Sequence, residues 1–150
     1  EESTISKSIE NKHIIKFHDF WISYERQLHQ IYEYYKHGTL LDIVAYNNRF
    51  NYLQILEIME QICCGLRQIH DLNIVHLDLK PGNIFFTKDY LLKIGDFGIS
   101  VDLNNKHKLT PSRSTRWKYS GDPIYIAPEL LSFTRSITDF DTSIDVFSLG

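Results

Sequence analysis

The sequence predicts an α+β fold for this chain of 150 residues. Residues 14–21 and 28–32 are short runs rich in apolar and aromatic side chains, as is typical of β-strands. Residues 52–72 instead repeat apolar side chains every three or four positions, which indicates a long amphipathic helix. Because 43% of the residues are hydrophobic, these elements can bury a sizeable core.

The long helix carries its own start and stop signals. Asn51 can cap its first turn, with Gln54 as the partner of a capping box, and Asn73 can end it. Its apolar side chains form one stripe that we expect to face a core. The stripe comprises Leu53, Leu56, Met59, Ile62, Cys63, Leu66 and Ile69.

Shorter segments complete the expected order of elements. Residues 1–10 look like the end of a helix, and residues 39–46 like a short helix that Asn47 and Asn48 terminate. Residues 102–120 are polar and irregular, as in a long loop.

Composition argues against several classes of protein. A net charge of −3 does not suit a surface for nucleic acids or anionic membranes, and the basic residues between Lys106 and Lys118 are most simply a solvated loop. Cys63 and Cys64 are adjacent in a helical pattern, which indicates reduced core thiols of an intracellular protein. No apolar run is long enough to span a membrane, and the histidines show no paired metal-ligand spacing.

The most informative stretch follows the long helix. It reads Val-His-Leu-Asp-Leu-Lys-Pro-Gly-Asn-Ile-Phe over residues 75–85, Asp-Phe-Gly follows at residues 96–98, and Ala-Pro-Glu at residues 127–129. Taken singly, Asp78 could be a turn residue and Asn83 a loop cap, as these residue types often are. The order and spacing of the whole set instead indicate one catalytic constellation.

These motifs resemble the signature set of eukaryotic protein kinases, from the end of kinase helix αC to the start of helix αF. The resemblance implies a two-lobe fold, with residues 1–35 as the end of the N-lobe and the hinge and residues 36–150 as the first half of the C-lobe. Glu1 or Glu2 would be the αC glutamate, although either could equally be a solvated acid. The sequence has no Gly-rich loop and no strand lysine for ATP, so we expect a piece of a longer kinase.

The resemblance also implies a role for each residue of the central motif. In a kinase of this pattern, Asp78 would be the catalytic base, and Asn83 and Asp96 would give oxygen ligands to Mg²⁺. Lys80 would be both catalytic and nucleotide-binding, as a point charge at the transferring phosphoryl group of ATP. Asp145 would brace the backbone of the loop that holds Asp78.

The hinge would be residues 33–38. By the same resemblance, backbone groups of Glu33 and Tyr35 would hydrogen-bond adenine, Phe85 would contribute to the nucleotide site together with Asn83 and Asp96, and Tyr32 would be the gatekeeper. An aromatic cluster in a strand can also be plain core, and that alternative stays open here.

Within the kinases, the chain is most similar to the Wee and Myt group, which inhibits cyclin-dependent kinases. Leu77 stands where most kinases have the arginine of His-Arg-Asp, and Asp122 where most Ser/Thr kinases have threonine; residues 127–131 and 145–150 are similar as well. Leu77 cannot clamp a phosphate on the activation loop. Asp122 would place a second carboxylate near Lys80 and favour an ion pair.

This resemblance implies transfer of the γ-phosphoryl group of ATP to tyrosine, or threonine and tyrosine, of a cyclin-dependent kinase, in the nucleus or cytoplasm. One alternative is a Ser/Thr kinase of translation initiation factor 2, which residues 17–21 and 83–85 suit but Leu77 and Asp122 do not. Another is a non-catalytic kinase module. The intact motif at residues 78–83 argues against the latter for the full-length protein.

Overall fold

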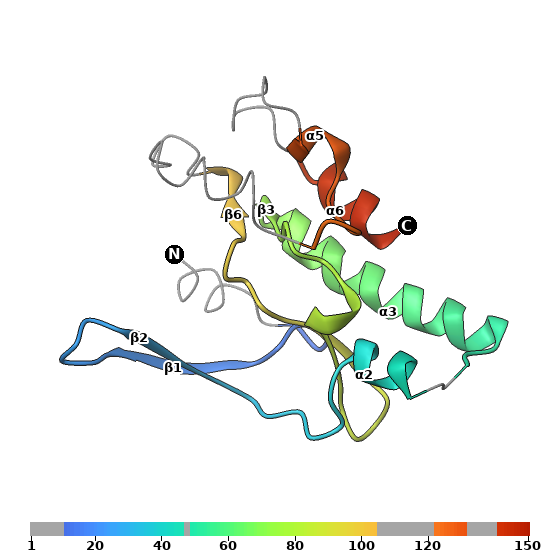
Figure 1. Cartoon of the computed structure of the whole chain (residues 1–150), viewed down its shortest axis with the longest axis horizontal. Helices are drawn as coiled ribbons and strands as arrows, with labels where there is room; N and C mark the ends of the chain where they lie inside the picture. The colour runs from blue at the N-terminus through green and yellow to red at the C-terminus, as the bar shows by residue number, and fades with distance from the viewer. Residues whose placement is uncertain (1–10, 47–48, 105–121, 132–140) are drawn as a thin grey trace.

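The computed structural model describes residues 11–46, 49–104, 122–131 and 141–150, which form an α+β arrangement (Figure 1). Within these residues, the strands form small two-stranded antiparallel sheets, and the longest helix has 20 residues. In chain order the elements are β1 (Phe17–Ile22), β2 (Leu28–Tyr32), α2 (Leu40–Ala45), α3 (Tyr52–Asp71), β3 (Ile74–Val75), the 3₁₀ helix η1 (Pro81–Asn83), β4 (Ile84–Phe86), β5 (Leu92–Ile94), β6 (Val101–Asp102), α5 (Pro128–Leu131) and α6 (Ser143–Leu149).

Strands β1 and β2 form a hairpin that reaches away from the rest of the chain in Figure 1. The predicted bounds of β2 are confirmed, but the strand expected at residues 14–21 lies at Phe17–Ile22. Ile14 and Ile15 are buried beside β5 instead, where the N–H of Ile15 donates to the carbonyl of Ile94 at 2.9 Å. The apolar run at residues 14–21 therefore contains two buried core residues, Ile14 and Ile15, followed by a hairpin strand. Its composition does not show where the strand begins.

Both ends of α3 follow the predicted capping pattern. The Asn51 side chain accepts from the Gln54 N–H at 3.0 Å, and the Gln54 side chain accepts from the Asn51 N–H at 2.9 Å. At the other end Asn73 has a φ of 58°, a left-handed conformation that asparagine tolerates better than most residues. The short helix α2 begins in the same way, since Thr39 and Asp42 form a capping box. The hydrogen bond from the Thr39 side chain lowers the pKa of Asp42.

Only the C-terminal half of the predicted apolar stripe lies in the core. Ile62, Leu66 and Ile69 are buried, whereas Leu53 and Leu56 are 69% and 46% exposed. The reason is that α3 packs on β3 and β5 along its later turns and extends beyond these short strands at its start.

The prediction that Cys63 and Cys64 are core thiols is wrong. Both cysteines are free of disulfides, as expected, but both are exposed. The packed side of α3 is marked by Gly65, where an added Cβ would lie 2.9 Å from Ile94 Cδ1 and 3.0 Å from the His13 carbonyl. The cysteines precede this close contact in sequence and lie on another side of the helix.

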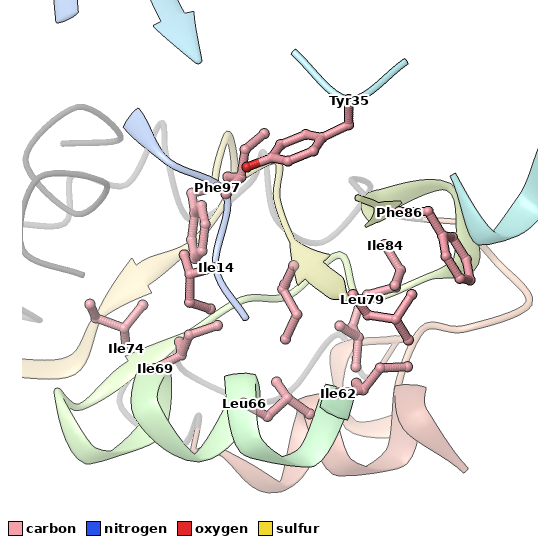
Figure 2. Close-up of a cluster of buried hydrophobic side chains, with 13 residues drawn as sticks. Ile14, Tyr35, Ile62, Leu66, Ile69, Ile74, Leu79, Ile84, Phe86 and Phe97 are labelled. Atoms are coloured by element: carbon pink, nitrogen blue, oxygen red, sulfur yellow. The ribbon is translucent and has the colours of Figure 1, made fainter. Parts of the chain in front are cut away.

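Figure 2 shows the main core, in which side chains of α3 are directed towards residues before β1 and around β4. Its buried members include Ile14, Ile62, Leu66, Ile69, Leu79, Ile84, Phe86 and Phe97. A second, smaller cluster combines Val75, Leu77, Val101, Ala127, Leu130 and Ile144. The loop that follows β3 contributes Leu77 to the second cluster and Leu79 to the main core, so packing in both clusters holds this loop.

Several predictions concern residues outside the described part. These are the helix end at residues 1–10 with Glu1 and Glu2, the terminating pair Asn47 and Asn48, and most of the irregular segment 102–120, including the span from Lys106 to Lys118. Asp102 itself belongs to strand β6. Among the described residues, no helix combines the length and the apolar character needed to cross a membrane.

Candidate active site

The loop after β3 is fixed by a buried carboxylate from the far end of the described chain. Asp145, in the first turn of α6, is fully buried and accepts hydrogen bonds from the N–H groups of His76 at 2.8 Å and Leu77 at 2.9 Å. Its Oδ2 also lies 2.9 Å from His70 Nε2, at the end of α3. The predicted bracing of this loop by Asp145 is confirmed.

Leu77 adopts an unusual backbone conformation within the braced loop. Its φ is 68°, which costs a residue with a large side chain on the order of 1–3 kcal/mol. The hydrogen bond to Asp145 and burial of the side chain, 4% exposed within the second cluster, offset this cost. The turn at Leu77 leads directly to Asp78.

His76 connects this loop to the Asp-Phe-Gly segment. Its ring is fully buried, with Nε2 3.0 Å from the Gly95 carbonyl and the ring centroid 5.1 Å from that of Phe97. The His76 carbonyl accepts from Ser100 Oγ at 3.1 Å. Both sides of the Asp-Phe-Gly segment are therefore anchored on one histidine.

Asp78, Lys80 and Asn83 form one hydrogen-bonded cluster. Lys80 Nζ donates to the two carboxylate oxygens of Asp78 at 3.0 and 2.8 Å, and Asn83 Nδ2 donates to Asp78 Oδ2 at 2.9 Å and to the Asp78 carbonyl at 2.8 Å. The turn η1 brings Asn83 back towards Asp78. Because Nδ2 faces Asp78, the amide oxygen of Asn83 is the atom left for another ligand.

Asp96 lies on the exposed side of the same region. Its φ is 64°, and its Oδ1 accepts from the Gly98 N–H at 3.3 Å. Asp96 itself is exposed, while the following Phe97 is 1% exposed in the core. The positive φ at Asp96 turns the chain at this point. The carboxylate of Asp96 therefore faces solvent, and the ring of Phe97 faces the interior.

Phe85 and Gly95 pack against one another beside this cluster. A Cβ on Gly95 would lie 2.9 Å from Phe85 Cε2 and 3.1 Å from Ile15 Cγ2. The Gly95 N–H donates to the Asn83 carbonyl at 2.9 Å. Half-buried Phe85 is therefore seated over a backbone position that has no room for a side chain.

The expected hinge residues follow β2. Glu33 receives a hydrogen bond from the Tyr35 hydroxyl at 2.9 Å, while its own N–H donates to the Lys16 carbonyl. Burial and the hydrogen bond to Glu33 raise the pKa of Tyr35, and burial lowers the pKa of the neighbouring Lys93. Within the described residues, the Glu33 carbonyl and the Tyr35 N–H make no backbone hydrogen bond, so both can serve an external ligand.

A family model described as "Protein kinase domain" matches residues 1–150. The chain belongs to the protein kinase family. The cluster of Asp78, Lys80 and Asn83, the Asp-Phe-Gly segment and the buried aspartate of α6 all lie within the residues that this family model matches.

The chain is similar to kinases of several kinds. It is 38% identical over 120 residues to the rat "Interferon-induced, double-stranded RNA-activated protein kinase", covering 79% of this chain and 22% of that protein. It is 35% identical to "Mitosis inhibitor protein kinase SWE1" of Candida albicans, covering 100% of this chain and 12% of that protein. It is 32% identical to "Cell cycle serine/threonine-protein kinase CDC5/MSD2" of Saccharomyces cerevisiae, covering 99% and 20%.

A solved structure has the same fold. The match is to a chain in the crystal structure of the yeast RNA Pol II CTD kinase CTDK-1 complex, with a TM-score of 0.78 and 23% identity, covering 99% of this chain and 45% of that one. The kinase fold is thus shown for this chain. The chain spans about a fifth or less of the length of the curated relatives named above.

One expected contact of this kinase site is absent from the described residues. Lys80 pairs with Asp78 and makes no ion pair with Asp122 there, so that prediction is wrong. The carboxylate of Asp122 instead accepts from the N–H of Ile124 at 3.1 Å, which forms a local turn. The Asp122 carboxylate, which we expected to pair with Lys80, is thus hydrogen-bonded to a backbone N–H two residues away.

Sequence reasoning missed the roles of His70 and His76. His76 lies in the motif at residues 75–85 and His70 near the end of the long helix, but nothing in the sequence shows that His70 contacts Asp145 or that the His76 ring contacts the Gly95 carbonyl. It also missed the contact of Phe85 with Gly95, for which the only sequence signal is a glycine directly before Asp-Phe-Gly. Tyr32, the expected gatekeeper, ends β2 half-buried, with its ring centroid 5.5 Å from that of Phe17.

Proposed function

We propose that the full-length protein is an ATP-dependent protein kinase that transfers the γ-phosphoryl group of ATP to a hydroxyl side chain of a protein substrate. The observation that carries this proposal is the hydrogen-bonded cluster of Asp78, Lys80 and Asn83 on a loop that Asp145 braces. Phosphoryl transfer depends mainly on positioning and on neutralising charge, and this cluster combines a carboxylate with a cation and an amide.

Each residue of the cluster has one task in the proposed reaction. Asp78 accepts the proton of the attacking hydroxyl, and the hydrogen bond from Asn83 Nδ2 sets the orientation of its carboxylate. Lys80 supplies a positive charge beside the transferred group. The braced turn at Leu77 keeps Asp78 in a fixed position, which lowers the cost of aligning the reacting atoms.

The site fits ATP and Mg²⁺. Mg²⁺ prefers hard oxygen ligands, and the exposed carboxylate of Asp96 and the amide oxygen of Asn83 are of this kind. The Glu33 carbonyl and the Tyr35 N–H match the donor and acceptor of an adenine edge, and the Phe85 ring offers the base an apolar face. Bound Mg²⁺-ATP supplies the phosphoryl group and neutralises part of its charge.

We favour a mitosis-inhibiting kinase of the Wee and Myt type, and this assignment also defines the substrate. It is supported by Leu77 and Asp122 and by the 35% identity to a protein named as a mitosis inhibitor protein kinase. On this proposal, the acceptor is a tyrosine, or a threonine and a tyrosine, of a cyclin-dependent kinase in the nucleus or cytoplasm. A second candidate is a Ser/Thr kinase of translation initiation factor 2, which residues 17–21 and 83–85 suit.

The two substrate classes are separated by one assay. The full-length protein is incubated with radiolabelled ATP and either a catalytically inactive cyclin-dependent kinase or translation initiation factor 2. We expect label on the ATP-loop tyrosine or threonine of the former and none on the latter. Efficient labelling of the initiation factor alone would exclude the Wee and Myt assignment.

The reaction itself is tested with Asp78→Asn in the full-length protein. Removing the base is expected to lower kcat by about 10²–10⁴-fold, because the acceptor hydroxyl keeps its proton. Binding of Mg²⁺-ATP, measured by calorimetry, should stay near the wild-type value, whereas Asp96→Asn should weaken it. Turnover near the wild-type value in Asp78→Asn would refute the assignment of the base.

A further inference from the structure

Two adjoining hollows are lined by residues of the hinge, the start of α3 and the turn between β4 and β5. Their volumes are about 370 and 470 Å³, and both are lined by His37, Phe86, Thr87 and Lys88. We call their union the basic groove. Asp78, Lys80, Asn83 and Asp96 line neither hollow. The smaller hollow borders the proposed adenine site, because Glu33 and Tyr35 line it, whereas the larger hollow is lined by none of the residues assigned to catalysis or nucleotide binding.

The charge of the groove differs from that of the chain. Its lining includes the cations Lys36, Arg49, Lys88 and Lys93, against the carboxylates of Glu33 and Asp89, whereas the whole chain carries a net charge of −3. In the described part of the chain, none of the four cations takes part in an ion pair. The larger hollow has Arg49 and Lys88 and no carboxylate in its lining.

The floor of the larger hollow is apolar. Ile43, Phe50 and Phe86 line it, and Phe86 is 7% exposed and belongs to the main core. Because Phe86 is held in the core, the residues of this floor cannot rearrange to bury their own apolar surface. The larger hollow therefore combines a fixed apolar surface with the cations Arg49 and Lys88, which make no ion pair with the described residues. This combination is the complement of an apolar side chain between acidic ones.

We propose that the basic groove docks a short acidic segment of a partner protein, with one apolar side chain of that segment on Phe50 and Phe86. The cations of the groove attract the acidic residues of such a segment. The apolar floor favours a peptide over a nucleic acid, because a peptide can place an apolar side chain there and a phosphate backbone cannot. This docking is distinct from the proposed phosphoryl transfer, since its binding energy comes from residues outside the catalytic cluster.

The test uses the full-length protein and a fluorescent peptide in which glutamates flank a single leucine. Binding is measured by fluorescence polarisation. We expect the double variant Arg49→Glu with Lys88→Glu to weaken binding at least about tenfold, equivalent to about 1.4 kcal/mol. The matched control is Lys12→Glu, because Lys12 is exposed and lines neither hollow, and it should leave the affinity unchanged.

Two further measurements make the outcome specific. Replacing the leucine of the peptide by serine should weaken binding, and phosphorylation of a short neutral substrate should be the same in the double variant as in the wild type. Equal affinity of the double variant and the wild type would overturn the proposal. Displacement of the peptide by duplex RNA, with the leucine having no effect, would instead identify the groove as a nucleic-acid surface and also overturn it.

Discussion

At the scale of single residues, Gly95 sets the shape of the proposed nucleotide site. The Phe85 ring occupies the space that a side chain at this position would need. Gly95→Ala should therefore destabilise the full-length protein by about 1–3 kcal/mol, as overpacking of a core generally does. The measurement is urea unfolding.

The matched experiment adds Phe85→Leu. The smaller side chain makes room for the new methyl group, so the double variant should recover stability relative to Gly95→Ala. If Gly95→Ala were as stable as the wild type, the contact with Phe85 would not be as tight as the distance of 2.9 Å implies.

Leu77 leads to a prediction about regulation. Its side chain is buried in an apolar cluster, so this position offers no cation to a phosphate on the activation loop. The full-length protein treated with phosphatase should keep most of its kinase activity. A kinase with arginine at this position is the control and should lose activity under the same treatment. A large loss in this protein would contradict our interpretation of Leu77.

At the scale of elements, the cap of α3 is the feature most open to measurement. The first turns of α3 are exposed and little stabilised by packing. The hydrogen bonds between Asn51 and Gln54 therefore stabilise this end of the helix. Asn51→Ala should lower the free energy of unfolding of the full-length protein by about 1 kcal/mol. Asn51→Asp keeps an acceptor for the Gln54 N–H and should have little effect. Equal losses of stability in the two variants would show that the acceptor on residue 51 does not account for the effect, and would contradict the capping role.

The same element shows what a pattern can predict. The caps and the length of α3 follow from local chemistry, so Asn51, Gln54 and Asn73 identify them without knowledge of the fold. Which part of its apolar stripe is buried depends on how far the short strands β3 and β5 reach along the helix. That length is a tertiary property, which is why Leu53 and Cys63 were assigned to the core and are exposed.

At the scale of the whole molecule, the described chain exposes large apolar side chains on several elements. Trp21 and Ile22 on the hairpin are 51% and 65% exposed, and Leu53 on α3 is 69% exposed. Exposed apolar surface favours association between chains, and domains are stable by only about 5–15 kcal/mol. The 150-residue polypeptide made alone should therefore aggregate or fold incompletely, and be inactive.

Purification of this polypeptide and a thermal melt with and without Mg²⁺-ATP test the prediction. A monomer with a cooperative transition that rises with nucleotide would contradict it.

The arrangement of the candidate site was predictable to the extent that it is contiguous in sequence. The residues from Asp78 to Asn83 are close in sequence, so their spacing identified them as one constellation. The hydrogen bonds from Lys80 and Asn83 to Asp78 were not predicted, because a spacing does not specify which side chains meet. Asp122 shows where such prediction fails. Whether its carboxylate pairs with Lys80 or with the N–H of Ile124 depends on distances in the folded chain, which the sequence spacing does not specify. The basic groove had no sequence signal, since its cations come from separate elements.

The buried carboxylate of α6 has a consequence for the order of folding during synthesis. Asp145 follows His76 by 69 residues and Leu77 by 68, so the catalytic loop leaves the ribosome well before its brace exists. Until α6 emerges, the hydrogen bond to Asp145 that helps to offset the cost of the positive φ of Leu77 is missing, so we expect the loop to sample relaxed conformations. The segment that will carry the chemistry is therefore among the last parts of the described chain to become rigid, although it lies in its middle. A nascent chain stalled before Asp145 should accordingly show rapid amide exchange at His76 and Leu77 beside an already protected α3.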